Sequence, residues 1–184
     1  MNFPTITKRN YLGELMTSLN YSVAIEIGVN AGKFSSKILS KWGGTLYMCD
    51  PWRHIDGYVD IANTDNESFE KIFQQAKDNT TRFRKRAKII RDLSINASLM
   101  FEDNSLDLVY IDADHSYNGC LLDIKTWFPK VKQGGLICGH DYLDANLPQG
   151  DFGVKSAVNE FFKREPDFTT IDDNPWSSWF IYKK

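Results

Sequence analysis

The stretch Val23-Ala24-Ile25-Glu26-Ile27-Gly28-Val29-Asn30-Ala31-Gly32 decides the fold class. Its first five residues are mostly apolar, which is typical of a short buried strand. Two glycines follow, four positions apart, and a segment with helical periodicity begins at Lys33. A strand that leads through a glycine turn into a helix is the first part of a βαβ unit. The stretch therefore predicts an α/β protein with a mostly parallel sheet.

The remaining chain continues the alternation of apolar runs with amphipathic stretches. Further strands are predicted near residues 45–49, 88–90, 106–111, 136–138, 168–171 and 178–182. Helices are predicted near residues 8–19, 33–40, 67–79, 117–128 and 154–162, and a long polar loop near 52–67. The last two strands have no helix between them, so we expect a hairpin in which one strand runs antiparallel to the rest of the sheet. We expect one domain over residues 1–184, with an N-terminal helix at about 8–19 and a core at 20–184.

Composition limits the classes of partner. The 184 residues are 42% hydrophobic and 25% charged, with a net charge of −2, which is ordinary for a soluble globular protein and unlike most nucleic-acid binders. The sequence contains neither an apolar run of membrane-spanning length nor a signal-peptide core, so we expect no membrane partner. Cys49, Cys120 and Cys138 form no close pairs, which favours reduced thiols and a cytoplasmic location. The sequence leaves a homo-oligomer open.

The glycine turn is a candidate cofactor site. Gly28 and Gly32 can adopt backbone angles that other residues resist, and the following helix offers free N–H groups. The spacing is G-x-x-x-G, with Asn30 between the glycines, and not the G-x-G-x-x-G of dinucleotide sites. Glu26 would repel a pyrophosphate, but it suits a cofactor with an ammonium group and a sulfonium, as S-adenosylmethionine has. The alternative is an ordinary strand-to-helix turn with an incidental glutamate.

Polar residues follow the next two strands. Asp50 ends the second strand, where a carboxylate can accept the two hydroxyls of a ribose, because ligands of open parallel sheets lie beyond the carboxyl ends of the strands. Asp92 and Ser94 follow the third strand, at the place where we expect an adenine. As an alternative, either residue caps a helix that begins after Ser94.

Together with these residues, two later motifs carry a family resemblance. They are Tyr110-Ile-Asp-Ala-Asp-His-Ser-Tyr117 and Gly134-Gly-Leu-Ile-Cys-Gly-His-Asp-Tyr142. Over about residues 20–182, the chain resembles the class I S-adenosylmethionine-dependent methyltransferases. More narrowly, it resembles the metal-dependent O-methyltransferases, including macrolide-sugar O-methyltransferases and, more distantly, catechol O-methyltransferase. The resemblance implies a Rossmann-like three-layer α/β sandwich with a seven-stranded sheet ordered 3-2-1-4-5-7-6, strand 7 being antiparallel.

A candidate metal site lies at the ends of the fourth and fifth strands. Asp112 ends the fourth strand, and His140 and Asp141 end the fifth, so these three potential ligands converge at one sheet edge. Asp112 would also lie beside the cofactor. Carboxylates suit Mg²⁺, which would lower the pKa of a hydroxyl acceptor. In the resembled families the position of His140 is typically Asp or Glu. The imidazole favours Mn²⁺, Fe²⁺ or Zn²⁺, or else His140 is not a ligand and the site holds no metal.

His115 is the candidate base. It completes the run Asp112-Ala113-Asp114-His115, which matches a D-x-x-H arrangement of some sugar O-methyltransferases. A neutral imidazole can take the acceptor's proton as the methyl group leaves sulfur. The alternatives are a packing or capping role for His115, and His140 as the base. Aromatic and histidine side chains that could shape the acceptor pocket are Trp52, His54, Tyr58, Tyr142 and Trp176.

The sequence therefore predicts an enzyme that moves a methyl group from S-adenosylmethionine to a hydroxyl of a small molecule, such as a sugar, with help from a divalent metal. One alternative is a nitrogen acceptor or a larger, carrier-bound acceptor. Another, of a different class, is a non-catalytic module that binds a nucleotide-like cofactor. The basic run between Arg82 and Lys88 is most simply a solvated helix end.

Overall fold

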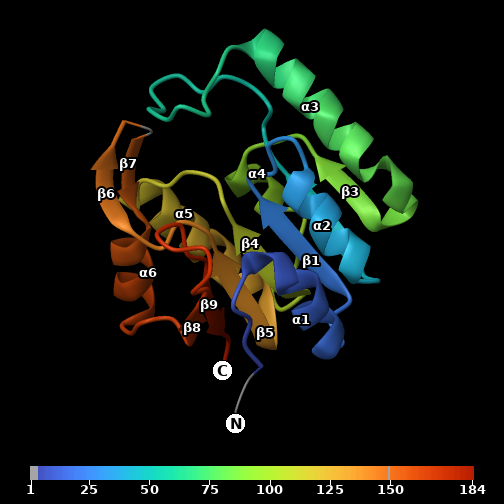
Figure 1. The fold of residues 1–184 in the computed structure, drawn as a ribbon, viewed down its shortest axis with the longest axis vertical. Helices are drawn as coiled ribbons and strands as arrows, with labels where there is room; N and C mark the ends of the chain where they lie inside the picture. The colour runs from blue at the N-terminus through green and yellow to red at the C-terminus, as the bar shows by residue number, and fades with distance from the viewer. Residues whose placement is uncertain (1–3, 149) are drawn as a thin grey trace.

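The structure is a computed structural model that describes residues 4–148 and 150–184. Residues 1–3 and 149, which belong to the predicted domain range, lie outside the described residues. Within the described part, seven strands form one sheet, with the order β3-β2-β1-β4-β5-β9-β8 (Figure 1). The strands are β1 (Val23–Ile27), β2 (Thr45–Cys49), β3 (Ala87–Ile90), β4 (Leu106–Ile111), β5 (Val131–Gly139), β8 (Phe168–Thr169) and β9 (Trp179–Tyr182).

The sheet topology confirms the predicted order 3-2-1-4-5-7-6, counted over the strands of this sheet. β1 to β5 are parallel, and β9 pairs antiparallel with both β5 and β8. The terminal hairpin arises as expected, because the short connection between its strands leaves no room for a crossover helix. β4 is buried at all six positions, as is expected of a central strand that is covered on both faces.

Helices cover both faces of the sheet and complete three layers. One face packs against α1 (Leu12–Ser18), α2 (Lys33–Lys41) and α3 (Asn66–Thr80). The other face packs against α4 (Ser94–Ser98), α5 (Tyr117–Trp127) and α6 (Val154–Phe162). Short 3-10 turns at Arg9–Tyr11, Thr81–Arg86 and Phe128–Lys130 join some of these elements. Each face therefore has its own apolar cluster, and the sheet lies between them.

Several features differ from the sequence-based expectation. The short helix α4 was not among the predicted helices, and β8 covers only the first two residues of the predicted 168–171. β5 begins at Val131, five residues earlier than predicted, because the chain pairs with β4 across a register shift between Leu106 and Leu108. A second, two-stranded sheet of β6 (Asp144–Leu147) and β7 (Gly150–Gly153) was not predicted. An isolated bridge joins Asp60 to Gly150, so the loop before α3 lies beside this hairpin (Figure 1).

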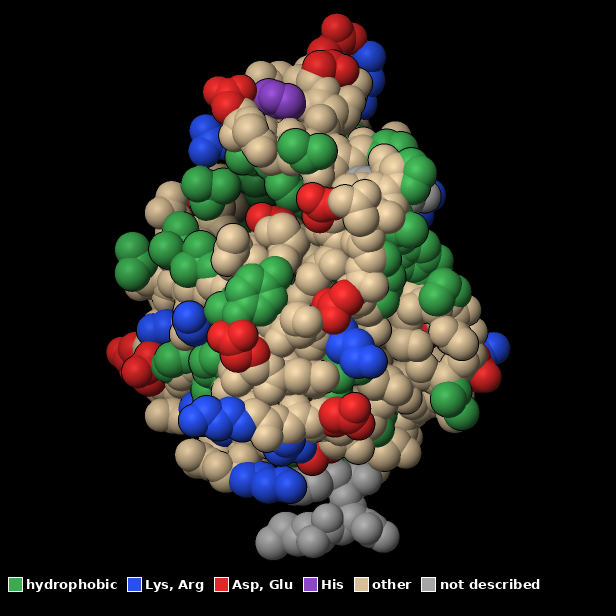
Figure 2. Space-filling model, turned by 90° about the vertical axis from the view of Figure 1, so that its left-hand side faces the viewer, with side chains coloured by type: hydrophobic (Ala, Val, Ile, Leu, Met, Phe, Trp, Pro, Cys, Tyr) green, Lys and Arg blue, Asp and Glu red, His purple; other side chains and the backbone are tan. Residues whose placement is uncertain are grey.

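The surface and the cysteines agree with an ordinary globular chain. Cys49, Cys120 and Cys138 are buried and free. Figure 2 looks onto the side of the molecule that carries β6, β7 and α6, and acidic and basic side chains are interspersed on this face. Among the described residues, no helix combines the length and the apolar character that crossing a membrane requires.

Candidate active site

The predicted cofactor turn connects β1 to α2. Gly28 has φ of +84° and Gly32 has φ of +70°, and Asn30 between them is also left-handed, with φ of +50°. A Cβ atom on Gly28 would lie 1.9 Å from the main-chain oxygen of Asp112, because β4 ends directly beside the turn. The glycine at this position is therefore required by close backbone packing between the ends of β1 and β4, in addition to its backbone angle.

Asp50, at the end of β2, holds the turn in shape. Its Oδ2 accepts hydrogen bonds from the backbone N–H groups of Val29 and Asn30, both at 2.9 Å, and its Oδ1 accepts from the N–H of Trp52 at 2.8 Å. Oδ2 already accepts two hydrogen bonds and Oδ1 accepts one, so one acceptor position on Oδ1 remains for a hydroxyl donor. Trp52 itself is 1% exposed, and its Nε1 donates to the carbonyl of Asn30. Trp52 therefore packs in the core and does not line the acceptor pocket as predicted.

Glu26, in β1, is almost fully buried. Its carboxylate accepts a short hydrogen bond from the Ser35 hydroxyl of α2. Burial raises the pKa of Glu26 to about 8, and the hydrogen bond from Ser35 opposes that shift only in part. A buried acid that lines a cavity is suited to a ligand that brings a positive charge.

A cavity of about 710 Å³ lies along the carboxyl ends of the strands, a size that is usual for small-molecule sites. Its lining follows the order of the sheet from β3 to β4: Ser94, Asp50, Glu26, Gly28, Asn30, Asp112 and His115. The structure therefore brings most of the predicted cofactor residues into one cavity. Gly32 lies at the start of α2, packed against Ala76, and is not part of the lining.

The two residues predicted beside an adenine separate in the structure. Asp92 is exposed, and its Oδ1 accepts from the N–H of Leu93 and from Asn96 Nδ2, as a residue at the start of α4 does. Ser94 lines the cavity, accepts a hydrogen bond from Trp127 Nε1 and donates to Asp123 Oδ1. Asp123, on α5, also lines the cavity, and burial raises its pKa to about 6. Asp92 thus bonds locally before α4 without capping it, since the N-cap residue is Leu93 and no side chain caps the helix, whereas Ser94 and Asp123 face the cavity.

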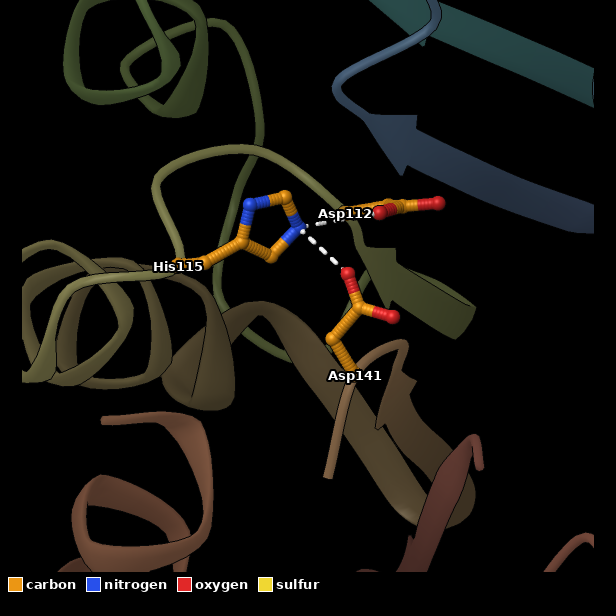
Figure 3. Close-up of side chains that lie close together, drawn as sticks. All are labelled: Asp112, His115 and Asp141. Atoms are coloured by element: carbon orange, nitrogen blue, oxygen red, sulfur yellow. Dashed lines mark hydrogen bonds and ion pairs between the residues drawn. The ribbon is translucent and has the colours of Figure 1, made fainter. Parts of the chain in front are cut away.

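An acidic cluster around His115 lies at the other end of the lining. His115 Nε2 lies 3.3 Å from Asp112 Oδ1 and 3.1 Å from Asp141 Oδ2 (Figure 3). Asp112 follows β4, Asp141 follows β5, and His115 comes from the loop that leads from β4 to α5. One potential ligand atom from each of the three residues lies within 4.8 Å of the others. The cluster can therefore hold a metal ion.

This cluster differs in one member from the predicted metal site. His115 occupies the central position that we expected for His140. Nδ1 of His140 lies 3.9 Å from Asp112 Oδ1 and 2.7 Å from the neighbouring Asp141 Oδ1. The close approach to Asp141 lacks hydrogen-bond geometry, and Asp141 Oδ1 is buried without a hydrogen-bond partner. The departure arises because the loop after β4 folds back over the strand end, which strand spacing alone does not reveal.

A third carboxylate approaches His115 from the loop before α3. Asp60 Oδ2 lies 3.5 Å from His115 Nδ1 and accepts a hydrogen bond from the Tyr58 hydroxyl at 3.2 Å. Burial lowers the pKa of His115, but hydrogen bonds to Asp112 and Asp60 and the charge of Asp141 outweigh it and raise the pKa to about 10. With the site as the structure has it, the ring therefore carries a proton at neutral pH.

Aromatic side chains close this end of the site. Phe152 of β7 stacks on the His115 ring, with the two centroids 5.1 Å apart, and Trp176 packs against Phe152. Tyr58 lines both the main cavity and a second cavity of about 470 Å³, which His54 also lines, between the loop and the β6–β7 hairpin. Tyr142 instead donates its hydroxyl proton to Asn159 of α6 and lines neither cavity.

The comparisons with known proteins agree with this geometry. A family model described as a methyltransferase domain matches residues 25–142, which is more than half of the chain. The chain belongs to this methyltransferase family. The matched range contains the glycine turn, Asp50, Asp112, His115 and Asp141. With the observed sheet order, this match confirms the predicted class I S-adenosylmethionine-dependent methyltransferase at the level of family and fold; the macrolide-sugar type is not confirmed.

Solved structures share the fold of the methyltransferase chain. A candidate caffeoyl-CoA O-methyltransferase from Staphylococcus aureus has a TM-score of 0.66 and 18% identity, over 98% of this chain and 86% of that one. An O-methyltransferase from Bacillus cereus in complex with SAH has a TM-score of 0.66 and 15% identity, over 98% and 82%. A candidate rRNA methylase from Clostridium thermocellum has a TM-score of 0.62 and 17% identity, over 97% and 100%. These likenesses concern the fold.

One curated relative also matches. It is the uncharacterized protein y4gI of Sinorhizobium fredii (strain NBRC 101917 / NGR234), which is 25% identical over 85 residues. The matched segment is 46% of this methyltransferase chain and spans only 9% of the relative's length.

Proposed function

We propose that this protein transfers a methyl group from S-adenosylmethionine to a hydroxyl of a small molecule. The observation that carries the proposal is the continuity of one cavity from Ser94 and Asp50, past Glu26, to Asp112 and His115. A methyl donor bound along the strand ends would present its sulfonium to the acidic cluster. The net charge of −2 and the O-methyltransferases among the fold relatives support a small acceptor over a nucleic acid.

The chemistry of each cavity residue indicates which part of the cofactor it would contact. Glu26 suits the ammonium of the methionine part, and the turn of Gly28, Asn30 and Gly32 shapes the backbone that faces the cofactor. The Asp50 carboxylate suits a ribose hydroxyl, since one acceptor position on its Oδ1 remains for a hydrogen bond. Ser94, next to the buried acid Asp123, takes the adenine end. Asp92 has no place in this assignment, because its side chain is used at the start of α4.

Asp112, His115 and Asp141 fit a divalent cation. Asp141 Oδ1 is a buried polar atom without a hydrogen-bond partner, as expected where a further group binds. Two carboxylates with one imidazole suit Mn²⁺ or Fe²⁺ and also accept Mg²⁺. When bound, such a cation polarises the acceptor oxygen and favours its deprotonation. His140 remains an alternative third ligand.

The reaction breaks the bond between the methyl carbon and sulfur and forms a bond between that carbon and the acceptor oxygen. Sulfur keeps the electron pair and S-adenosylhomocysteine leaves, while the oxygen loses its proton. His115 is assigned to that proton, because its ring lies at the cavity end beside Asp112 and beneath Phe152. A cation would offset the charges of Asp112 and Asp141 that keep the ring protonated, and with Nε2 toward the cation, Nδ1 would be the nitrogen that accepts the proton. Phe152, Tyr58 and the second cavity would hold the acceptor, which is a hydroxylated molecule such as a sugar.

Methylation of a panel of hydroxylated compounds, sugars included, tests this function. We expect a methyl ether as product, loss of activity on chelation and recovery with Mn²⁺ or Mg²⁺. The variant His115→Ala should lower turnover about 100-fold while the affinity for S-adenosylhomocysteine stays within about twofold. Unchanged turnover in His115→Ala would contradict a catalytic role for His115. Full activity in the presence of a chelator would contradict the need for a cation. A product methylated only on nitrogen would contradict the hydroxyl acceptor.

A further inference from the structure

A cation from the N-terminal segment enters the cofactor cavity. Arg9, in the 3-10 turn before α1, lines the same cavity as Glu26 and Gly28. Its Nη1 donates to Asp112 Oδ2 at 3.2 Å, and its guanidinium lies 4.9 Å from the centroid of the Phe34 ring at the start of α2. The side chain is 30% exposed, so a ligand in the cavity can reach it.

The backbone around Arg9 is fixed by the C-terminal part of the chain. The N–H of Arg9 donates to Asp173 Oδ2 at 2.8 Å. Two residues before it, the carbonyl of Thr7 accepts hydrogen bonds from the N–H groups of Ile171 and Asp172, both at 3.1 Å. These backbone contacts, together with the Phe34 ring and Asp112, hold the guanidinium in the cavity that Gly28 also lines, before any ligand binds. Such preorganisation lowers the entropy cost of binding.

Arg9 and the buried Glu26 bring a positively charged group and an acidic group to the same cavity. Burial raises the pKa of Glu26, and the positive charge of Arg9 opposes that shift, which places the two groups in electrostatic contact. Arg9 has five N–H donors, and its contacts with Asp112 and the Tyr110 hydroxyl leave donors for a ligand. Lys33 and Arg53 also line the cavity, but both are exposed, and the charge of Arg53 acts on Asp92 instead.

We propose that Arg9 binds the carboxylate of the methionine part of S-adenosylmethionine, while Glu26 binds its ammonium. The inference rests on the proposed cofactor and adds a residue that recognises it. The amino-acid end of the cofactor carries one positive and one negative group, and Glu26 with Arg9 presents the complementary charges at one place in the cavity. A guanidinium suits a carboxylate because it can form two parallel hydrogen bonds with it.

The comparison of S-adenosylmethionine with its decarboxylated analogue tests the proposal, because the analogue lacks only the group that Arg9 would bind. Calorimetric affinities of both ligands are measured for the wild type, for Arg9→Gln, and for Lys8→Gln. Lys8 is the control because it is the neighbouring cation, pairs with Asp172 and does not line the cavity. We expect Arg9→Gln to weaken S-adenosylmethionine binding by about 10- to 100-fold and the analogue by less than about twofold. Lys8→Gln should leave both affinities within about twofold of the wild type.

Each outcome bears on a different claim. Equal losses for the two ligands, or no loss for either, would overturn the role of Arg9. A wild type that binds neither ligand would overturn the proposed cofactor itself. If Arg9→Gln does not fold, two other measurements test the proposal. The wild type should bind S-adenosylmethionine more tightly than the analogue, and this preference should be smaller in Arg9→Lys. Lack of that preference in the wild type would also contradict the proposal.

Discussion

Gly28 is the residue at which the fold and the site depend on each other most directly. Its φ of +84° is in the left-handed region, and a Cβ atom would meet the carbonyl oxygen of Asp112 at 1.9 Å. The end of β1 and the end of β4 can therefore lie side by side only with a glycine here. Their contact places Glu26 and Asp112 on one cavity.

Gly28→Ala should destabilise the protein by about 3 kcal/mol or more, since neither strand end can move away without breaking the sheet. Gly57→Ala is the matched control. Gly57 also has a left-handed φ, of +78°, but nothing lies within 4 Å of an added Cβ atom. Gly57→Ala should lower the free energy of unfolding by only about 1–2 kcal/mol, because it introduces an unfavourable left-handed φ but no steric clash. Denaturant unfolding measures both variants, and equal losses would contradict the steric argument.

Glu26 gives the folded protein a pH dependence with a definite sign. Its pKa rises from the ordinary value of 4.5 to about 8 on folding, chiefly through burial. Between these values the unfolded chain loses the Glu26 proton while the folded protein keeps it, so stability falls as the pH rises from about 4.5 to 8. Glu26→Gln should flatten that part of the profile and stabilise the cofactor-free protein at pH 8 by on the order of 2 kcal/mol.

Unfolding by urea at pH 5, 6, 7 and 8 measures this effect without cofactor or metal. Glu67→Gln is the control, because Glu67 lies on the surface of α3 and pairs with Lys71 at i,i+4. Its profile should follow that of the wild type. If Glu26→Gln and the wild type lose stability in parallel over this range, Glu26 does not hold its proton in the folded protein.

At the residue scale, the sequence was informative where function coincides with a strand end. Asp50, Asp112 and Asp141 were predicted as site residues from that position alone, and the structure places all three at the expected edge. Arg9, Asp60 and Asp123 were not predicted as site residues. They come from a 3-10 turn, a loop and a helix, and their direction depends on contacts between segments far apart in the sequence.

At the scale of elements, the β6–β7 hairpin is the least predictable part of the molecule. β6 reads Asp-Ala-Asn-Leu, which has no β-branched or aromatic residue and is too short for its alternation of polar and apolar residues to identify a strand. Its pairing with β7 and the bridge between Asp60 and Gly150 depend on main-chain hydrogen bonds. The sheet strands were predicted from short apolar runs, and the helices other than the short α4 from an apolar face with a clear period.

We expect the β6–β7 hairpin to affect the reaction of the acceptor and not the binding of the cofactor. Phe152→Ala removes the ring that stacks on His115, which we expect to lower kcat/KM for the acceptor by about 10-fold or more through loss of packing at the reacting centre. The affinity for S-adenosylhomocysteine should stay within about twofold. Leu99→Ala, at an 84% exposed position beyond α4, is the control. If Phe152→Ala weakens the affinity for S-adenosylhomocysteine and leaves kcat/KM for the acceptor unchanged, the hairpin contributes to cofactor binding and the prediction is wrong.

At the scale of the whole molecule, the sheet order was predictable because parallel strands need crossover helices and the last two strands lack one. How the chain ends meet was not predictable. The Tyr182 hydroxyl donates to the carbonyl of Pro4 at 2.8 Å, so the first described residues lie beside the last strand. This contact, with those around Thr7 and Arg9, joins the N-terminal segment to the last strand and brings it to the mouth of the cavity.

Calorimetric titration of the purified protein with S-adenosylhomocysteine tests the central claim most directly, because it requires no knowledge of the acceptor. The cavity along β1, β2 and β4 predicts one bound molecule per chain, with a Kd between about 1 μM and 1 mM, the range usual for enzyme ligands. Folded protein that gives no binding heat and no thermal stabilisation with millimolar S-adenosylhomocysteine or S-adenosylmethionine would contradict the assignment of this cavity to the methyl donor.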